Sequence, residues 1–258
     1  MAMLQKLTGG LSSKAARHYC SKPFTLRNRA PMVSFTFDDV PDSAYRNGAA
    51  LLEEFRWRGT FYIASGTCGT RDEFWDVIGR DQVAALHRQG HEVGCHTFSH
   101  VPVSALDAGA LDNEIARNGE TLRALCGDLA PTSFCFPFGK VSLPRKLQLQ
   151  ARFDTCRSIY EGVNAGRIDL AMLRVIELYD RTLTPEKLAA VLRETRERNG
   201  WLIFYTHDVA DAPSWIGCSP RRMRATLAAV RDAGLDCLTV RDALEAAGYR
   251  RAAASRAA

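Results

Sequence analysis

The sequence predicts a single α/β domain built on a mostly parallel sheet, either open or closed into a barrel. Seven short runs rich in β-branched and aromatic residues recur along the 258 residues, as buried strands do. Helical patterns separate most of these runs, and such alternation is typical of a parallel sheet covered by helices. The chain also has no internal repeat, low-complexity linker or shift in composition that would mark a domain boundary.

The expected elements follow from these runs and from helix end signals. The strands are expected at 32–37, 60–64, 91–95, 132–136, 172–178, 201–206 and 235–240. The helices are expected at 43–58, 81–89, 111–126, 240–247, between Thr184-Pro185 and Gly200, and between Ser219-Pro220 and Gly234. The last two have Pro at the first position and Gly beyond the end, which is the preferred capping pattern. We expect 1–30 to be a loosely attached arm, 31–249 the folded domain and 250–258 a flexible tail.

Composition excludes several classes of protein. Hydrophobic residues make up 46% and charged residues 24% of the chain, which is ordinary globular usage. The formal charge of +5 is spread too evenly to predict nucleic-acid binding. The eight cysteines include no C-x-x-C pair, so neither a thiolate zinc site nor a redox motif is indicated.

The sequence as written predicts a soluble, cytoplasmic protein without a membrane span. Its first residues lack the apolar core of about 7 to 15 residues that a secretory signal has. No stretch approaches the roughly 18 apolar residues that a spanning helix needs.

Polar side chains gather where three expected strands end. These are Asp38 and Asp39 after the first strand, His96 and His100 after the third, and His207 with Asp208 after the sixth. Because the carboxyl ends of parallel strands meet on one rim, we expect these groups to lie together.

The spacing of His96 and His100 indicates a metal site. Two imidazoles four residues apart on a turn can reach one ion, and the Asp38–Asp39 pair can add a carboxylate. Each feature alone also fits a structural interpretation: a core histidine, a surface histidine and two turn-forming aspartates. Their coincidence at strand ends favours the site.

Two apolar segments have two open interpretations each. FCFPFGK at 134–140, which contains Pro137 and Phe138, forms either aromatic packing or the wall of a groove. Trp215 and Ile216, in the loop after His207, either line an acyl pocket or cover the mouth of the sheet or barrel.

Four of these segments resemble the ordered motifs of the polysaccharide deacetylase family, the NodB-like enzymes of carbohydrate esterase family 4. They are TFDD at 36–39, GHEVGCHTFSH at 90–100, FCFPFG at 134–139 and LIFYTH at 202–207. The resemblance spans 31–247 and implies a distorted (β/α) barrel of about seven strands. It also implies one divalent metal ion, usually zinc, and hydrolysis of the N-acetyl amide of an amino-sugar substrate.

The resemblance further implies a role for each matching residue. Asp39, His96 and His100 would be metal ligands, Asp38 the general base and His207 the general acid. The main-chain N–H of Phe138 would stabilise the oxyanion. From their places in the aromatic turn and in the loop after His207, we expect Pro137, Phe138 and Trp215 to contact substrate.

The chain departs from the family pattern around the base and the acid. Cys135 stands where many members carry an arginine that pairs with the base, and we expect Arg174 to supply that guanidinium from another strand. The Asp-Trp motif that tunes the catalytic histidine is missing, so either Asp180 or Asp208 has that role or no residue has it.

The sequence therefore favours a deacetylase acting on an N-acetylated saccharide or glycan intermediate. Two alternatives stay open: an amidohydrolase acting on a non-sugar amide such as a cyclic imide or ureide, and a non-catalytic sugar-binding barrel. Two histidines and one carboxylate also describe iron oxygenases, although a second aspartate and His207 fit hydrolysis better. Motifs of serine hydrolases and nucleotide-binding proteins do not occur.

Overall fold

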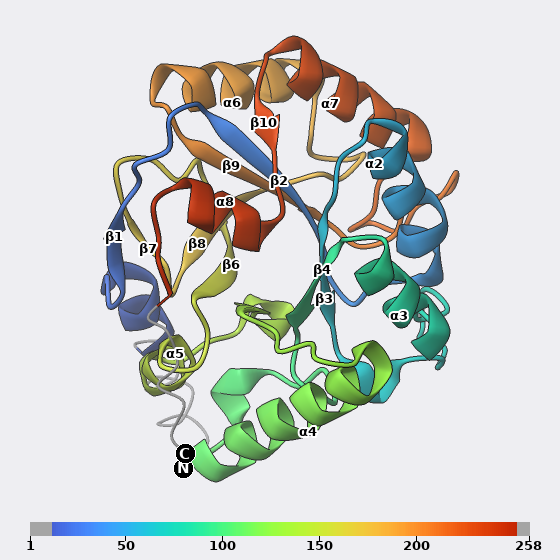
Figure 1. The fold of residues 1–258 in the computed structure, drawn as a ribbon, viewed down its shortest axis with the longest axis vertical. Helices are drawn as coiled ribbons and strands as arrows, with labels where there is room; N and C mark the ends of the chain where they lie inside the picture. The colour runs from blue at the N-terminus through green and yellow to red at the C-terminus, as the bar shows by residue number, and fades with distance from the viewer. Residues whose placement is uncertain (1–11, 252–258) are drawn as a thin grey trace.

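A closed barrel of seven parallel strands forms the centre of the molecule, in a computed structural model that describes residues 12–251 (Figure 1). In spatial order the strands are β2 (Met32–Phe37), β3 (Thr60–Ile63), β4 (Glu92–Cys95), β5 (Ser133–Cys135), β6 (Thr155–Glu161), β8 (Leu173–Glu177) and β9 (Trp201–Thr206). The barrel closes where β2 pairs with β9 along its whole length, from Met32↔Trp201 to Phe37↔Thr206. Both strands are buried throughout, which explains their nearly continuous apolar sequences. The predicted α/β barrel is confirmed.

Helices surround the barrel, as expected for parallel strands joined by crossover connections (Figure 1). They are α2 (Ala50–Glu54), α3 (Arg80–Arg88), α4 (Ala108–Cys126), α5 (Leu143–Gln150), α6 (Pro185–Glu197), α7 (Pro220–Asp232) and α8 (Val240–Ala246), with a π-helical turn, η1 (Ala44–Ala49), leading into α2. The side chains of Thr184 and Ser219 cap α6 and α7 as predicted, each accepting a hydrogen bond of 3.2 Å from a main-chain N–H. After α6, however, Asn199 with φ +46° adopts the left-handed conformation in place of Gly200.

The end of the barrel at which the strands begin is closed by α8. The main-chain N–H of Val240 donates to Thr60 Oγ1, and that of Arg241 donates to the buried carboxylate of Glu92. Thr60 and Glu92 are the first residues of β3 and β4. The opposite end, where the strands finish, therefore remains available for a site.

Three strands and two helices of the described residues escape the sequence prediction. They are β1 (Pro23–Thr25), β6, β7 (Arg167–Asp169), α5 and a helix at 12–18. The run expected at 235–240 is reduced to β10 (Asp236–Cys237), which pairs with the first two residues of β2, whereas β3 pairs with its last two. One edge of β2 is occupied along its whole length by β9. Strands β10 and β3 therefore share the other edge of β2.

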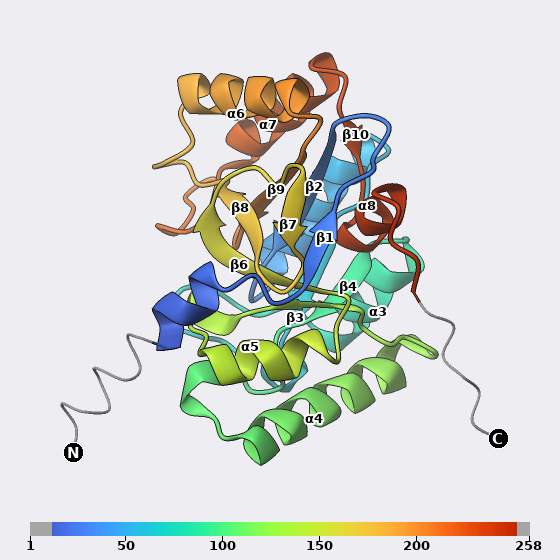
Figure 2. The same ribbon diagram turned by 90° about the vertical axis from the view of Figure 1, so that its left-hand side faces the viewer.

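The segment before the barrel is packed against it, contrary to the expected loose arm. Strand β1 pairs antiparallel with β7 (Figure 2). Lys146 is fully buried, and its Nζ donates to the carbonyl oxygens of Ala16 at 2.7 Å and Tyr19 at 2.6 Å. The same Nζ lies 2.6 Å from the carboxylate of Asp169. Residues 1–11 of the expected arm and 252–258 of the expected tail lie outside the described residues.

Within residues 12–251, none of the helices combines the length and the apolar character needed to cross a bilayer.

Candidate functional site

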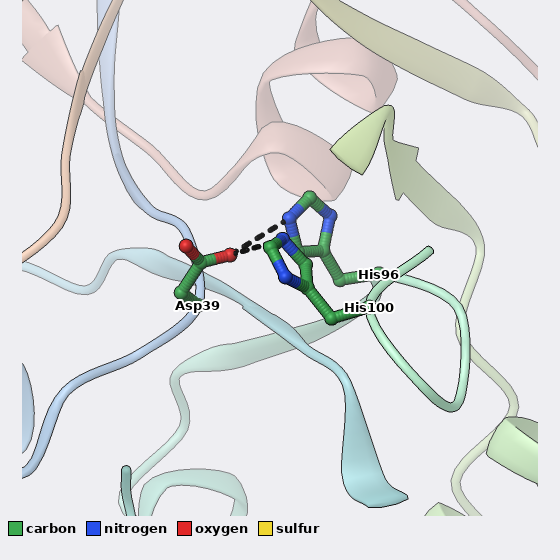
Figure 3. A group of neighbouring side chains, drawn as sticks. All are labelled: Asp39, His96 and His100. Carbon is green, nitrogen blue, oxygen red and sulfur yellow. Dashed lines mark ion pairs between the residues drawn. The ribbon is translucent and has the colours of Figure 1, made fainter. Parts of the chain in front are cut away.

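Asp39, His96 and His100 come together at the end of the barrel where the strands finish (Figure 3). Asp39 follows β2, His96 follows β4, and His100 lies in the loop after it. The Nε2 atoms of His96 and His100 lie 3.1 Å and 2.8 Å from Asp39 Oδ1. One ligand atom of each residue lies within 4.8 Å of the other two. The structure thus brings together the three residues that the sequence singled out.

The loop with both histidines is held in a costly backbone conformation. Thr97 and His100 have φ values of +62° and +52°, a region that side chains with a Cβ rarely adopt. Glu114 of α4 holds this loop: its carboxylate accepts from the main-chain N–H of Phe98 at 2.9 Å and from that of Ser99 at 2.8 Å. Such strain persists only where the surrounding structure enforces it, and it is frequent at functional sites.

The donor set fits a divalent metal ion. Asp39 Oδ1 is buried and accepts no hydrogen bond from residues 12–251, although two imidazole nitrogens lie close to it. His96 Nδ1 lies 2.8 Å from the carbonyl oxygen of Cys135, so Nδ1 carries the proton and Nε2 is left as the ligand atom. Burial raises the pKa of Asp39, but its contacts with His100 and His96 hold that pKa well below the ordinary value. Two imidazoles and one ionised carboxylate form an open site of the kind zinc occupies.

Asp38 forms a buried ion pair with Arg157. The guanidinium contacts both carboxylate oxygens and lies 4.9 Å from the ring centre of Tyr205 and 5.2 Å from that of Tyr62. Burial raises the pKa of Asp38, whereas the charge of Arg157 lowers it, and the net result is a lowered pKa. Arg157 is paired in register with Cys135 on the adjacent strand. The guanidinium that the family motif places on β5 therefore comes from β6 in this chain.

The expectation that Arg174 pairs with Asp38 is wrong. Arg174 is exposed on β8 between the buried residues Leu173 and Val175, so it points away from the barrel interior. Its Nη1 donates instead to the carbonyl oxygen of Glu161 at 3.0 Å. Arg157 was missed because the mixed sequence TCRSIYE of β6 was not recognised as a strand.

His207 faces the group formed by Asp39, His96 and His100 and is held by the main chain. Its Nε2 lies 3.9 Å from Asp39 Oδ2, and its Nδ1 lies 3.2 Å from the carbonyl oxygen of Ile216. Neither candidate for tuning it makes that contact: Asp208 accepts from Ser214, and Asp180 accepts from Ser219. A main-chain carbonyl thus orients the imidazole in place of the expected carboxylate.

One cavity of about 560 Å³ connects these groups. Its walls include Asp38, Asp39, His96, His100 and His207 together with apolar and aromatic side chains. Sequence reasoning missed Trp75, whose ring stacks against His207 with centres 6.0 Å apart, and Tyr179, Tyr205, Glu177 and Ile159, which also line the cavity.

Two of the three residues predicted to contact substrate line this cavity, and the third does not. Phe138 and Trp215 line it, and the ring of Phe138 lies 4.4 Å from that of His100. Pro137 is buried and does not line it, which corrects the prediction for that residue. Phe138 has φ +57° and forms a sharp turn with Gly139, which directs its ring into the cavity mouth.

The fold and the site define a class: a single-domain (β/α) barrel whose strand ends present a candidate mononuclear metal centre beside a buried Asp–Arg pair and a histidine. A family model described as "Polysaccharide deacetylase" matches residues 26–153. Over these residues the chain is similar to the polysaccharide deacetylase family.

Curated relatives named as deacetylases are similar to about two fifths of the chain. The chain is 28% identical over 109 residues to a chitin deacetylase of Arthroderma benhamiae, covering 41% of this chain and 27% of that protein. It is 25% identical over 111 residues to a chitooligosaccharide deacetylase of Sinorhizobium fredii, covering 43% and 48%. The matches thus span less than half of these relatives' length.

The fold is similar to that of family 4 carbohydrate esterases. One from Bacillus anthracis superposes with a TM-score of 0.61 at 14% identity, over 90% of this chain and 91% of that chain. A family 4 acetyl xylan esterase from Clostridium thermocellum, solved with a cobalt ion, gives 0.60 at 20% identity, over 85% and 93%. At such identities the likeness shows the fold.

Proposed function

We propose that the protein is a metal-dependent deacetylase that hydrolyses the N-acetyl amide of an amino-sugar substrate. The observation that carries this proposal is the convergence of three ligand side chains, a buried Asp–Arg pair and a histidine on one cavity. Asp39, His96 and His100 would hold the ion, for which we propose zinc. Bound there, zinc would lower the pKa of water and polarise the amide carbonyl.

In this hydrolysis Asp38 is the general base and His207 is the general acid. Asp38 accepts a proton from the attacking water, and Arg157 keeps its carboxylate ionised and fixed in orientation. His207 is anchored through Nδ1 to Ile216, so its Nε2 faces the cavity. From there the protonated imidazole donates to the amide nitrogen as the C–N bond breaks, so that the nitrogen leaves as a neutral amine and not as its anion, which is a very poor leaving group. We assign the main-chain N–H of Phe138 to the oxyanion, as the family motif implies.

The relatives' names support an N-acetylated saccharide as substrate. Those names are chitin deacetylase, chitooligosaccharide deacetylase and peptidoglycan-N-acetylglucosamine deacetylase. The cavity has aromatic walls, which suit the C–H faces of a sugar ring. A cytoplasmic location stays a prediction, as does the absence of nucleic-acid partners.

Acetate release from N-acetylglucosamine oligosaccharides tests the proposal. In zinc-supplemented buffer we expect release by the wild type and a loss of about 100- to 10,000-fold in kcat for Asp38→Asn. Arg174→Ala is the control, because it removes a charged side chain that does not line the cavity, and this variant should retain activity. Full activity of Asp38→Asn would exclude Asp38 as the base. Hydrolysis of a cyclic imide without acetate release from any sugar would contradict the substrate class.

A further inference from the structure

Four exposed apolar side chains surround the mouth of the cavity, and we call them the mouth rim: Phe74, Phe138, Ile159 and Trp215. They are 50%, 55%, 41% and 60% exposed, respectively, and all four line the cavity. Residues 12–251 include six large apolar side chains that are at least 39% exposed, and four of these six gather at this one place. Clusters of this kind on a protein surface mark binding sites.

The mouth rim is built from four separate segments, each held by local contacts. Asp72 Oδ1 accepts from the main-chain N–H of Phe74 at 2.7 Å, which fixes the turn that presents this ring. Arg181 Nε donates to the carbonyl oxygen of Trp215 at 2.5 Å, and its guanidinium lies 5.1 Å from the indole centre. The side chains are therefore held exposed by ordered turns.

Ile159 and Phe138 form the remaining part of the mouth rim. Ile159 packs so closely on Gly139 that a Cβ there would collide with it, and the ring of Phe138 rests on His100. Ile159 brings an aliphatic surface without a flat ring on which a sugar could stack. Among the polar side chains that line the cavity, Asp72 Oδ1 and Arg181 Nε are bonded to the main chain and Glu177 accepts from the hydroxyl of Tyr205, which leaves fewer polar atoms for the hydroxyl groups of a saccharide.

We propose that the mouth rim binds an apolar group attached to the amino sugar. The preferred substrate is then an amphiphile, an N-acetylated sugar that carries an alkyl or acyl chain, and a longer saccharide is the poorer substrate. This inference rests on the proposed function for the position of the sugar beside Asp39, His96 and His100. A substrate that reaches those residues passes the mouth rim. An apolar chain attached to the sugar would therefore cover the mouth rim and bury the exposed apolar surface of its four side chains.

Kinetics on three substrates test the inference. We would measure kcat/KM for methyl and octyl N-acetylglucosaminides, the latter below its micelle concentration, and for N,N′,N″-triacetylchitotriose. We expect the octyl glycoside to exceed both others by about tenfold or more. In the double variant Phe74→Ser/Ile159→Thr the octyl-to-methyl ratio should fall to about one. Leu147→Ala removes an apolar side chain that is 39% exposed away from the cavity, and it should leave the ratio unchanged.

A binding measurement separates this inference from the proposed function. Calorimetric titration of the Asp38→Asn protein with the octyl and methyl glycosides needs no turnover. Octyl binding at least about tenfold tighter than methyl binding, lost in the Phe74→Ser/Ile159→Thr background, supports the mouth rim even if no sugar is deacetylated. Equal affinity for the two glycosides, a higher kcat/KM for the chitotriose, or an octyl preference that survives the double variant overturns the inference.

Discussion

Arg157 shows how one buried residue can replace another across a strand pair. It stands beside Cys135 in the register of β5 and β6, and its guanidinium reaches the carboxylate that an arginine at position 135 would contact. A buried guanidinium is tolerable only with a partner charge and favourable neighbours, which Asp38 and the rings of Tyr62 and Tyr205 supply. In this chain the cation beside Asp38 therefore comes from β6.

Removing this guanidinium should damage both stability and activity. Arg157→Ala leaves Asp38 buried without its partner, and we expect a loss of about 3–5 kcal/mol in the free energy of unfolding. Urea unfolding measures this loss, and Arg174→Ala is the control, with a change of at most about 0.5 kcal/mol. Equal stability of the two variants would show that the ion pair is not formed.

His91 should make the protein less stable at mildly acidic pH. Burial lowers its pKa from 6.5 to about 4, and its Nδ1 accepts a hydrogen bond from Gly59 N–H at 3.0 Å. Between these two pKa values the unfolded chain binds the proton more readily than the folded chain, so stability falls as the pH drops from 6.5 towards 4. The loss attributable to His91 should reach about 2–3 kcal/mol.

Urea unfolding at pH 7 and pH 4.5 measures this dependence in the wild type and in His91→Gln. The difference between the two pH values should be smaller in His91→Gln, because glutamine does not titrate. An identical difference in both proteins would assign the acid sensitivity to other groups.

Among the elements, α4 has a role beyond covering the barrel. Glu114 holds the loop that contains both histidines, and one turn further Asn118 donates to the carbonyl oxygen of Ile63 and accepts from the main-chain N–H of Ser65. One face of this helix thus positions the ends of β3 and β4. The spacing of His96 and His100 could be read from the sequence, but this support comes from a helix more than ten residues away and has no sequence motif.

Loss of this support should weaken metal binding. In Glu114→Ala the main-chain N–H groups of Phe98 and Ser99 lose their acceptor, so the left-handed backbone at Thr97 and His100 is no longer enforced. We expect zinc affinity to fall about 10- to 100-fold, as measured by competition with a chromogenic chelator. Glu120→Ala on the exposed face of the same helix is the control, and an equal effect of both variants would contradict the role of Glu114.

The fold elements also show where sequence reasoning stops. Strands β2 and β9 were predicted to the residue because continuous apolar runs in fully buried strands are distinctive. Strand β6 mixes buried and exposed positions, includes an arginine and ends at the surface, so its pattern does not separate it from a loop. The error at Arg174 follows from this omission: without β6, β8 was the nearest recognised strand that carried an arginine.

At the scale of the whole molecule, tertiary contacts decide what local patterns cannot. The sequence indicated alternating strands and helices, but closure of the sheet depends on the pairing of β2 with β9, about 170 residues apart. In the same way, Lys146 attaches the segment before the barrel through the carbonyl oxygens of Ala16 and Tyr19 and the carboxylate of Asp169. No property of that segment alone predicts its attachment.

Removing Lys146 should release this segment. In Lys146→Met we expect faster cleavage by protease within residues 12–22 and a loss of about 3–5 kcal/mol in unfolding free energy, because Asp169 stays partly buried without its partner charge. Lys187→Met breaks an exposed ion pair with Glu161 and serves as the control, costing at most about 1 kcal/mol. Cleavage of both variants at the wild-type rate would show that Lys146 does not hold the segment.

Metal content tests the central claim most directly. After dialysis against zinc and removal of the excess, mass spectrometry should find one zinc ion per chain in the wild type and none in His96→Ala, with both proteins folded by circular dichroism. Folded wild-type protein that retains no ion, or a His96→Ala variant that still retains one, would contradict a metal centre at Asp39, His96 and His100.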